Sequence, residues 1–242
     1  MSSYKNFSVF YDLFTYNVNY KKRTKYLLKL FEKFDRKPTL LLDLACGTGG
    51  FSFEFAKKEI EVVGVDMSED MLCEAQTKNT AENKVLFLCQ KAEELELYGT
   101  VDGAVCCLDS LNHIINYEDF KKSISKVSLF LEPQRLFVFD VNTPYKHQFV
   151  LGNNTFKIKK KGVTCIWENK FSEENNLVDT HLTFIQKGNV LNQDITERAY
   201  SDEEIRVALN EAGLEVLAVY TENTFKAPKE KSCRNVYITR KV

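Results

Sequence analysis

The sequence has no surplus of charge of either sign. Its 242 residues carry 33 basic and 34 acidic side chains, which gives a formal net charge of −1 at neutral pH. Binding to a polyanion through bulk electrostatics needs a basic excess, so this balance gives no strong nucleic-acid signal. The one basic run, residues 159–161, leads into Gly162 and is interpreted as a solvated turn.

Cysteine pairs of the kind that hold metals or exchange disulfides are also absent. The seven cysteines include no C-x-x-C pair and no clustered ligand set, so we expect no metal. Most of them lie in apolar runs, which indicates small reduced core residues. No apolar run reaches membrane-spanning length, and residues 1–5 lack the apolar core of a signal peptide. Together these absences predict a cytoplasmic protein that does not associate with membranes.

Internal repeats and low-complexity tracts are missing as well, and short apolar runs instead alternate with helical segments between residues 39 and 140. Apolar residues at helical spacing mark about 18–34 and 117–131, and Ser68 fits a helix N-cap. Near-continuous apolar strands separated by helices are typical of a parallel sheet covered on both faces. The strand candidates are Leu40–Ala45, Glu61–Asp66, Val85–Leu88, Val101–Leu108 and Leu136–Asp140.

The pattern changes to a period of two over about residues 154–200. Val163, Cys165 and Trp167 share one face there, and polar turn-forming segments separate the alternating runs. Alternation of this kind, interrupted by glycine- and asparagine-containing turns, predicts an antiparallel β meander.

The α/β pattern resumes where Ser201 is followed three residues later by Glu204, a match to the capping box that begins a helix. Two closing strand candidates follow that helix. We therefore expect one doubly wound Rossmann-like domain from residues 1–145 and 201–242. The segment 146–200 is expected to be an inserted antiparallel β subdomain.

A glycine-rich turn joins the first strand candidate to its helix. The segment Asp43–Gly50 reads Asp-Leu-Ala-Cys-Gly-Thr-Gly-Gly. Gly47 and Gly49 allow a tight turn and let the backbone approach a ligand without an intervening Cβ. Asp66 ends the next strand, and the carboxyl ends of adjacent parallel strands face one crevice. A carboxylate in that crevice can accept hydrogen bonds from both ribose hydroxyls, so the pattern predicts an adenosine-containing ligand.

Two further features indicate which adenosine ligand fits. The dinucleotide fingerprint G-x-G-x-x-G needs a third glycine, and Ser52 stands there. Asp43 would repel a pyrophosphate but attract the α-ammonium of a methionine group. No Gly-Lys-Ser/Thr occurs in the turn, which excludes a P-loop. The pattern therefore favours a ligand that joins adenosine to an amino acid.

On these residues the chain resembles the class I S-adenosylmethionine-dependent methyltransferases. Segments 92–93 and 107–113 also match the family, whereas Lys91 stands where the family often has Asp. The resemblance implies S-adenosylmethionine as cofactor and a mainly parallel sheet with an antiparallel last strand. It implies that Asp66 binds the ribose and that Met67 lies near the adenine. The full set of expected cofactor residues is Asp43, Ala45, Cys46, Gly47, Thr48, Gly49, Asp66, Met67, Ala92, Glu93 and Leu108.

The methyl acceptor is expected beyond the fourth strand, where His113 follows. A histidine can take up a proton near neutral pH, so His113 is a candidate base, with packing as the alternative. At Tyr11 and His113 the chain resembles the aminosugar N-methyltransferases of this fold. Tyr11 lies in an aromatic leading segment that either packs or closes over the sulfonium. Candidate substrate contacts, each weighed against a purely structural role, are Asn112, Trp167, Arg198 and Tyr200.

These patterns favour methyl transfer to the nitrogen or oxygen of a small molecule, with the insertion and the leading segment selecting the substrate. A protein or RNA substrate remains open as an alternative. A nicotinamide-dependent oxidoreductase and a noncatalytic cofactor-binding protein are the other hypotheses. The segment Asn142–Tyr145 resembles the signature of enzymes that methylate nucleic-acid amines, but it follows the fifth strand rather than the fourth.

Overall fold

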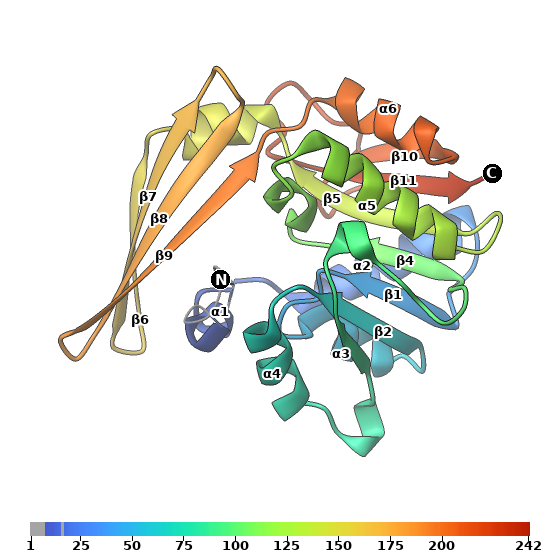
Figure 1. Ribbon diagram of the computed structural model, residues 1–242, viewed down its shortest axis with the longest axis horizontal. Helices are drawn as coiled ribbons and strands as arrows, with labels where there is room; N and C mark the ends of the chain where they lie inside the picture. Colours follow the sequence, from blue (N-terminus) through green and yellow to red (C-terminus); the bar gives the residue numbers. More distant parts are fainter. Residues whose placement is uncertain (1–7, 16) are drawn as a thin grey trace.

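Two β-sheets of different kinds organise residues 8–15 and 17–242, the part of the chain that the computed structural model describes (Figure 1). The larger sheet contains β1 (Leu40–Leu44), β2 (Glu61–Asp66), β3 (Leu86–Cys89), β4 (Gly103–Cys106), β5 (Leu136–Asn142), β10 (Leu214–Thr221) and β11 (Arg234–Lys241). Their spatial order is β10-β11-β5-β4-β1-β2-β3. Strands β1 to β5 pair in parallel, whereas β11 runs antiparallel to both neighbours. The predicted mainly parallel sheet with an antiparallel last strand is confirmed.

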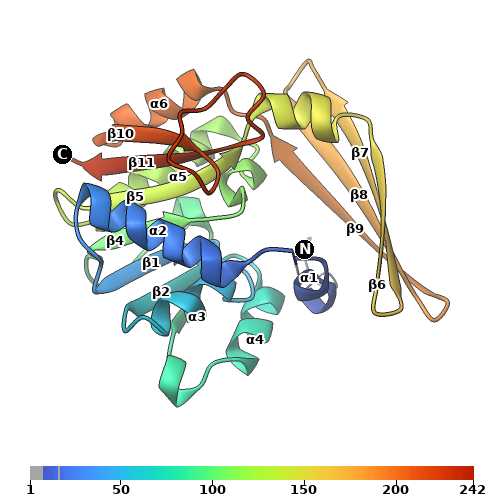
Figure 2. The same ribbon diagram turned by 180° about the vertical axis from the view of Figure 1, so that it is seen from behind.

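Helices cover both faces of this sheet. They are α2 (Tyr20–Phe34), α3 (Gly50–Ala56), α4 (Glu69–Thr77), α5 (Tyr117–Phe130) and α6 (Asp202–Glu211). α5 and α6 pack on one face and α2 and α3 on the other, which Figures 1 and 2 show from opposite sides. Alternate residues of β1 lie on opposite faces of the sheet. Leu42 belongs to the same apolar cluster as Phe120 of α5, and Leu41 belongs to the same cluster as Phe31 of α2. Burial on both faces explains why the central strands β1, β4 and β5 are mostly apolar.

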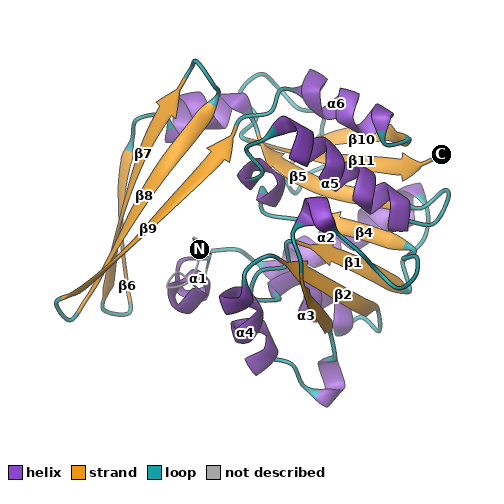
Figure 3. Ribbon diagram, viewed as in Figure 1, coloured by secondary structure: helices purple, strands orange, loops and turns teal. Residues whose placement is uncertain are grey.

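The second sheet consists of four antiparallel strands in chain order, as the meander prediction requires. They are β6 (Thr155–Lys160), β7 (Val163–Ser172), β8 (Leu177–Gln186) and β9 (Asn189–Arg198). Figure 3 shows these strands standing apart from the larger sheet, with a helical segment between β5 and β6. That segment is a π-helix, Lys146–Leu151. The exact boundaries of the two predicted domains stay a prediction.

Helix α1 (Ser8–Phe14) lies between the two sheets (Figure 1). The Phe10 ring stacks on Phe184 of β8 with centroids 5.1 Å apart, and the Phe14 ring lies 5.2 Å from the same side chain. Met71 of α4 belongs to the same apolar cluster. The rest of the predicted aromatic leading segment, residues 1–7 and 16, lies outside the described residues. α1 therefore connects the second sheet to the larger domain.

Helix starts follow their predicted capping residues. The Ser68 side chain accepts a hydrogen bond from the Met71 amide at the start of α4. At the start of α6 the Ser201 hydroxyl accepts from the Glu204 amide, while the Glu204 carboxylate accepts from the Ser201 amide. Both predicted caps are confirmed. Among the described residues, no helix is both long enough and apolar enough to cross a membrane.

The capping box of α6 gives a direct test of local stability. Ser201→Ala removes the hydroxyl that receives the Glu204 amide, so the free energy of unfolding should fall by about 1 kcal/mol. Ser125, exposed in the middle of α5, offers a matched control, and its replacement by Ala should leave stability unchanged or slightly raised. Urea unfolding of both variants measures the difference. Equal stability of the two variants would show that the cap contributes nothing.

Candidate active site

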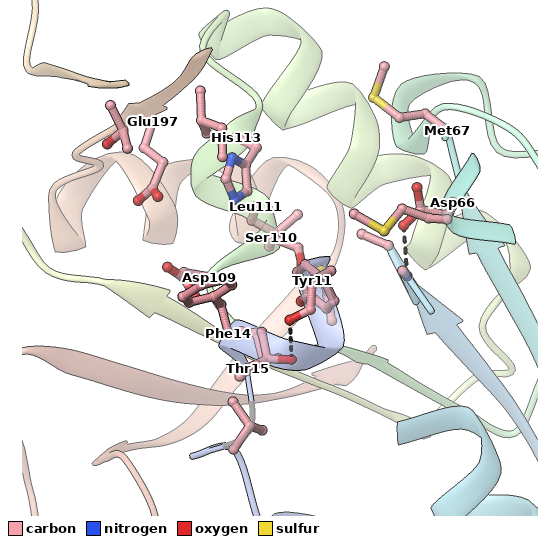
Figure 4. Close-up of a pocket in the computed structure, with 18 of the residues that line it drawn as sticks. Tyr11, Phe14, Thr15, Asp66, Met67, Asp109, Ser110, Leu111, His113 and Glu197 are labelled. Carbon is pink, nitrogen blue, oxygen red and sulfur yellow. Dashed lines mark hydrogen bonds between the residues drawn. The ribbon is translucent and has the colours of Figure 1, made fainter. Parts of the chain in front are cut away.

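A cavity of about 450 Å³ lies between the carboxyl ends of the parallel strands and the inner face of the second sheet. Its lining includes Gly47, from the turn after β1, and Asp66, at the end of β2, together with His113 and Glu197. Figure 4 shows Asp66 on one side, His113 and Glu197 on the opposite side, and Tyr11 between them. A ligand held at the glycine turn can therefore face a second ligand held beneath the second sheet.

Asp66 fixes the conformation of the glycine turn. Its carboxylate accepts hydrogen bonds from the amide nitrogens of Gly47, at 2.8 Å, and Ser68, at 2.9 Å. Burial raises the pKa of Asp66, and these two bonds limit the rise. Gly47 has φ of +55°, in the left-handed region that favours glycine. No atom lies within 4 Å of the place that a Cβ on Gly47 would occupy. The turn thus offers bare backbone to the cavity, with a carboxylate beside it.

The eleven residues predicted to bind the cofactor divide into two groups. Met67, which follows Asp66, is 55% exposed and borders the cavity. The members that line the cavity are Ala45, Gly47, Asp66, Met67, Ala92, Glu93 and Leu108, whereas Asp43, Cys46, Thr48 and Gly49 do not. The residues of the second group support the turn without reaching the cavity lining. Contact of any of these residues with the cofactor stays a prediction.

Asp43 belongs to that second group. It is 2% exposed, and its Oδ2 accepts a hydrogen bond of 2.5 Å from the Ser52 hydroxyl. Burial raises the pKa of Asp43 to about 7, although the Ser52 bond opposes the shift. Ser52, at the position of the third fingerprint glycine, therefore ties the start of α3 to β1. Any attraction of Asp43 for a ligand's ammonium acts through space rather than at the cavity wall.

Removal of the Asp43 charge should change the pH dependence of stability. In the folded protein this carboxyl stays protonated up to about pH 7, whereas in the unfolded chain it ionises near pH 4. The folded state therefore binds the extra proton between pH 4 and 7, and its stability falls as the pH rises through that window. Asp43→Asn removes this fall, so its stability relative to the wild type should grow from pH 4 to 7 and then level off. The difference should reach on the order of 3 kcal/mol.

Urea unfolding at pH 4.5, 6 and 8 measures that difference. Parallel stability profiles for the wild type and the Asn variant would contradict it, because they would mean that Asp43 ionises equally in both states.

Thr48 connects the glycine turn to helix α1. Its hydroxyl donates to Asp12 Oδ1 at 2.7 Å, and the other oxygen of Asp12 receives the Lys78 ammonium at 2.5 Å. Tyr11, the neighbour of Asp12, lines the cavity. The glycine turn and the aromatic helix over the cavity are therefore held as one unit.

A second turn in the left-handed region follows β4, the strand that pairs with β1. Leu108 and Asp109 have φ of +59° and +55°, an uncommon conformation for residues with a Cβ. Asp140, on β5, stabilises it by accepting the Leu108 amide at 3.0 Å and the Asp109 amide at 2.7 Å. Arg234 of β11 bridges Asp109, at 2.6 Å, and Asp140, at 3.2 Å. The Asp109 side chain is thus fixed at the cavity wall.

Glu197 brings a second carboxylate to the same end of the cavity, from β9. Its Oε2 lies 2.9 Å from His147 Nε2 and 3.2 Å from Asn142 Nδ2. Burial alone would raise the pKa of Glu197. The His147 hydrogen bond and nearby positive charge, including Lys146, outweigh that effect and hold the pKa well below its usual range. Glu197 therefore presents a negative charge to the cavity.

The residues predicted for catalysis and substrate binding also divide. His113 and Glu197 are close enough for their charges to interact. The Trp167 indole donates a hydrogen bond of 2.7 Å to Asn169 Oδ1, which fixes the orientation of its ring. The predicted residues that line the cavity are Tyr11, His113 and Trp167, and those outside its lining are Asn112, Arg198 and Tyr200. The three residues outside it have structural contacts instead.

Asn112 joins the two sheets. Its Oδ1 accepts the Asn142 amide at 2.9 Å, and its Nδ2 donates to the Asn142 carbonyl at 3.3 Å and to the Arg198 carbonyl at 2.8 Å. The side chain is fully buried. Asn112 therefore sets how the end of β9 lies against the end of β5.

Arg198 and Tyr200 pack against the larger domain. The Arg198 guanidinium pairs with Glu204 at 2.8 Å and lies 5.0 Å above the Tyr200 ring. Tyr200 stacks on Phe120 with centroids 4.0 Å apart, and its hydroxyl donates to the Ile114 carbonyl. These contacts attach the exit of the second sheet to α5 and α6.

Sequence reasoning missed the charged residues that line the cavity near His113. Asp109 followed a predicted strand in the same way as Asp66 and could have been found by that analogy. Glu197 lies one residue before the predicted Arg198, and on a strand that one step changes the face. Lys146 and Arg234 carried no local signal. The four cavity-lining residues missed are Asp109, Lys146, Glu197 and Arg234.

Comparisons with known proteins agree with this geometry. A family model described as a methyltransferase domain matches residues 41–134. The candidate methyltransferase YqeM of Bacillus subtilis (strain 168) is 30% identical over 98% of this chain and 97% of its own length. An S-adenosylmethionine-dependent methyltransferase from Clostridium acetobutylicum superposes with a TM-score of 0.88 at 31% identity, over 99% of each chain.

A more distant structure shares the fold. CalS10, an amino pentose methyltransferase from Micromonospora echinaspora whose structure contains bound S-adenosylmethionine, superposes with a TM-score of 0.77 at 16% identity. The superposition covers 97% of both chains, so it includes the second sheet as well as the larger one.

Proposed function

Because this chain belongs to the S-adenosylmethionine-dependent methyltransferases, we propose that it transfers the cofactor's methyl group to an amine nitrogen of a small molecule. The family and its cofactor confirm the predicted enzyme class over an oxidoreductase or a noncatalytic protein. The acceptor is our inference, and it depends on one observation. Two carboxylates, Asp109 and Glu197, line the cavity on the side opposite Asp66 (Figure 4).

The residues at the glycine turn fit S-adenosylmethionine. The open backbone at Gly47 provides room for close approach, and the Asp66 carboxylate beside it suits the two ribose hydroxyls. Met67 and Ala92 border the same part of the cavity and suit the adenine ring. The bound cofactor supplies a methyl group already activated on a sulfonium, so the protein mainly has to align the acceptor and exclude water.

The acceptor end suits a cationic amine with an apolar body. A protonated amine is attracted to a pair of carboxylates, whereas a neutral hydroxyl gains little from them. Apolar residues of the second sheet also line the cavity, among them Ile158, Leu182 and Phe184. The CalS10 structure, which contains the same second sheet, is that of an enzyme acting on an amino sugar. This likeness supports an amine acceptor and the role of segment 146–200 in selecting it.

An amine must lose its proton before its nitrogen can attack the methyl group. We assign this proton transfer to His113, which lines the cavity at the acceptor end near Glu197. Tyr11, from α1, borders the space between the two ends and is assigned to closing it against water.

Cofactor binding tests the first half of the proposal. Asp66→Ala removes the proposed ribose acceptor, so the Kd for S-adenosylmethionine should rise by roughly 10- to 100-fold. Isothermal titration measures the change, with S-adenosylhomocysteine and NADH titrated alongside. Asp70→Ala, four residues further along and outside the cavity lining, is the matched control. Tight binding of NADH but not of S-adenosylmethionine would overturn the cofactor assignment.

The acceptor is tested by methyl transfer to a panel of small amines, alcohols and carboxylic acids, with a protein and an RNA mixture included. We expect turnover of amines only. Glu197→Gln keeps the side-chain shape but removes the charge, so the KM for the best amine should rise by about tenfold or more while the Kd for S-adenosylmethionine stays constant.

Glu203→Gln removes the charge of an exposed glutamate on α6 and is the control for that variant. It should leave the KM unchanged. Turnover confined to alcohols, or to the macromolecular substrates, would refute the amine assignment.

A further inference from the structure

Asn142 lies where the two sheets meet and contacts both carboxylates of the acceptor end. Its side chain is 1% exposed, and its Nδ2 donates one hydrogen bond to Asp109 Oδ2 and another, of 3.2 Å, to Glu197 Oε2. Its Oδ1 accepts from the Lys146 ammonium at 2.8 Å. Two acceptors at the nitrogen and one donor at the oxygen leave only one orientation of the amide that satisfies all three partners.

The two carboxylates come from different parts of the fold. Asp109 follows β4 of the larger sheet, and Glu197 belongs to β9 of the second sheet. Two negative groups brought together in a partly buried site repel each other unless donors lie between them. The Asn142 amide group supplies one N–H to each. It is therefore a neutral bridge that lets both carboxylates occupy one side of the cavity.

We propose that Asn142 is a positioning residue that holds Asp109 and Glu197 as a pair for recognition of the acceptor's ammonium group. The inference rests on the proposed amine methylation and assigns its acceptor specificity to this bridge. Asn142 does not have to touch the substrate. It acts by fixing the separation and direction of the two groups that do.

The position of Asn142 is set independently of its side chain. Its backbone amide and carbonyl are both bonded to the Asn112 side chain, at 2.9 and 3.3 Å. Asn112 also binds the Arg198 carbonyl next to Glu197. A change confined to the Asn142 side chain therefore leaves the backbone contact between β5 and β9 in place.

Other charged groups face the same bridge, and the charges of Arg234 and Lys146 both reach Glu197 at longer range. Arg234 of β11 pairs with Asp109 and also with Asp140, while His147 of the π-helical segment pairs with Glu197. Lys146, from that same segment, contacts the bridge itself rather than either acid. The Asn142 amide is hydrogen-bonded to both acids and so joins Asp109 to Glu197 directly.

Asn142→Asp tests the bridge with almost no change of shape. Above neutral pH the new carboxylate replaces two donors by a third negative group, so the KM for the amine should rise at least tenfold. The Kd for S-adenosylmethionine should stay within twofold of the wild type. As the pH is lowered toward 6, neighbouring negative charges favour protonation of the introduced carboxyl, which can then donate again. The ratio of the variant KM to the wild-type KM should therefore decrease toward 1 as the pH is lowered.

Asn142→Leu separates this effect from a loss of packing. Leucine has no hydrogen-bond donor at any pH. The ratio of the KM of this variant to that of the wild type should therefore be raised and should not decrease as the pH falls. Asn192→Asp, the same substitution at an exposed position of β9, controls for added charge and should keep the wild-type KM. Thermal unfolding and cofactor titration confirm that each variant is folded.

The outcomes separate the two levels of inference. A wild-type enzyme that methylates no amine refutes the proposed function, and the positioning role with it. A wild-type enzyme that methylates amines, with wild-type KM in a folded Asp or Leu variant, overturns the positioning role alone. If the Asp variant does not fold, the Leu variant decides by its KM. An Asp variant whose KM ratio is the same at every pH also overturns the role, because it indicates a packing effect.

Discussion

The site depends on the hydrogen bonds that a carboxylate at the end of one parallel strand accepts from the backbone amides of a neighbouring turn. Asp66, at the end of β2, accepts the Gly47 amide from the turn after β1. The two strands pair in parallel register, with Leu44 opposite Val65, so their ends reach the same edge. The bond keeps the turn in its left-handed conformation and the backbone open to the cavity. Without it, neither the Asp66 carboxylate nor the open backbone at Gly47 would be fixed.

The same arrangement recurs on the other side of the cavity. Asp140 of β5 accepts the amides of Leu108 and Asp109 from the turn after β4, and both of those residues have positive φ. Under the proposed function, one carboxylate turn serves the cofactor and the other serves the acceptor. Because β4 and β1 are neighbours in the sheet, the two turns lie on one rim, and the cavity between them is continuous.

The second sheet completes the site by adding a mostly apolar wall to the polar rim formed by the two turns. The residues that it contributes to the cavity are mostly apolar, with Thr180 on β8 and Glu197 near the end of β9 as polar members. The sequence pattern predicted this meander correctly but selected Arg198 and Tyr200, which pack on α5 and α6 instead. Alternation identifies two faces of a strand, but it does not say which face is turned toward a cavity formed by another part of the chain.

The sheet, its helices, the caps and the glycine turn could be predicted because each follows from residues close together in the chain. The cofactor family follows from the same local pattern. The polar cluster around Asn142 could not be predicted, because it depends on how distant segments pack. Asn142 is 33 residues from Asp109 and 55 from Glu197, and these distances along the chain leave no periodic signal. Their contact arises from the packing of two sheets against each other, and a pattern read along one segment contains no information about which other segment will cover it.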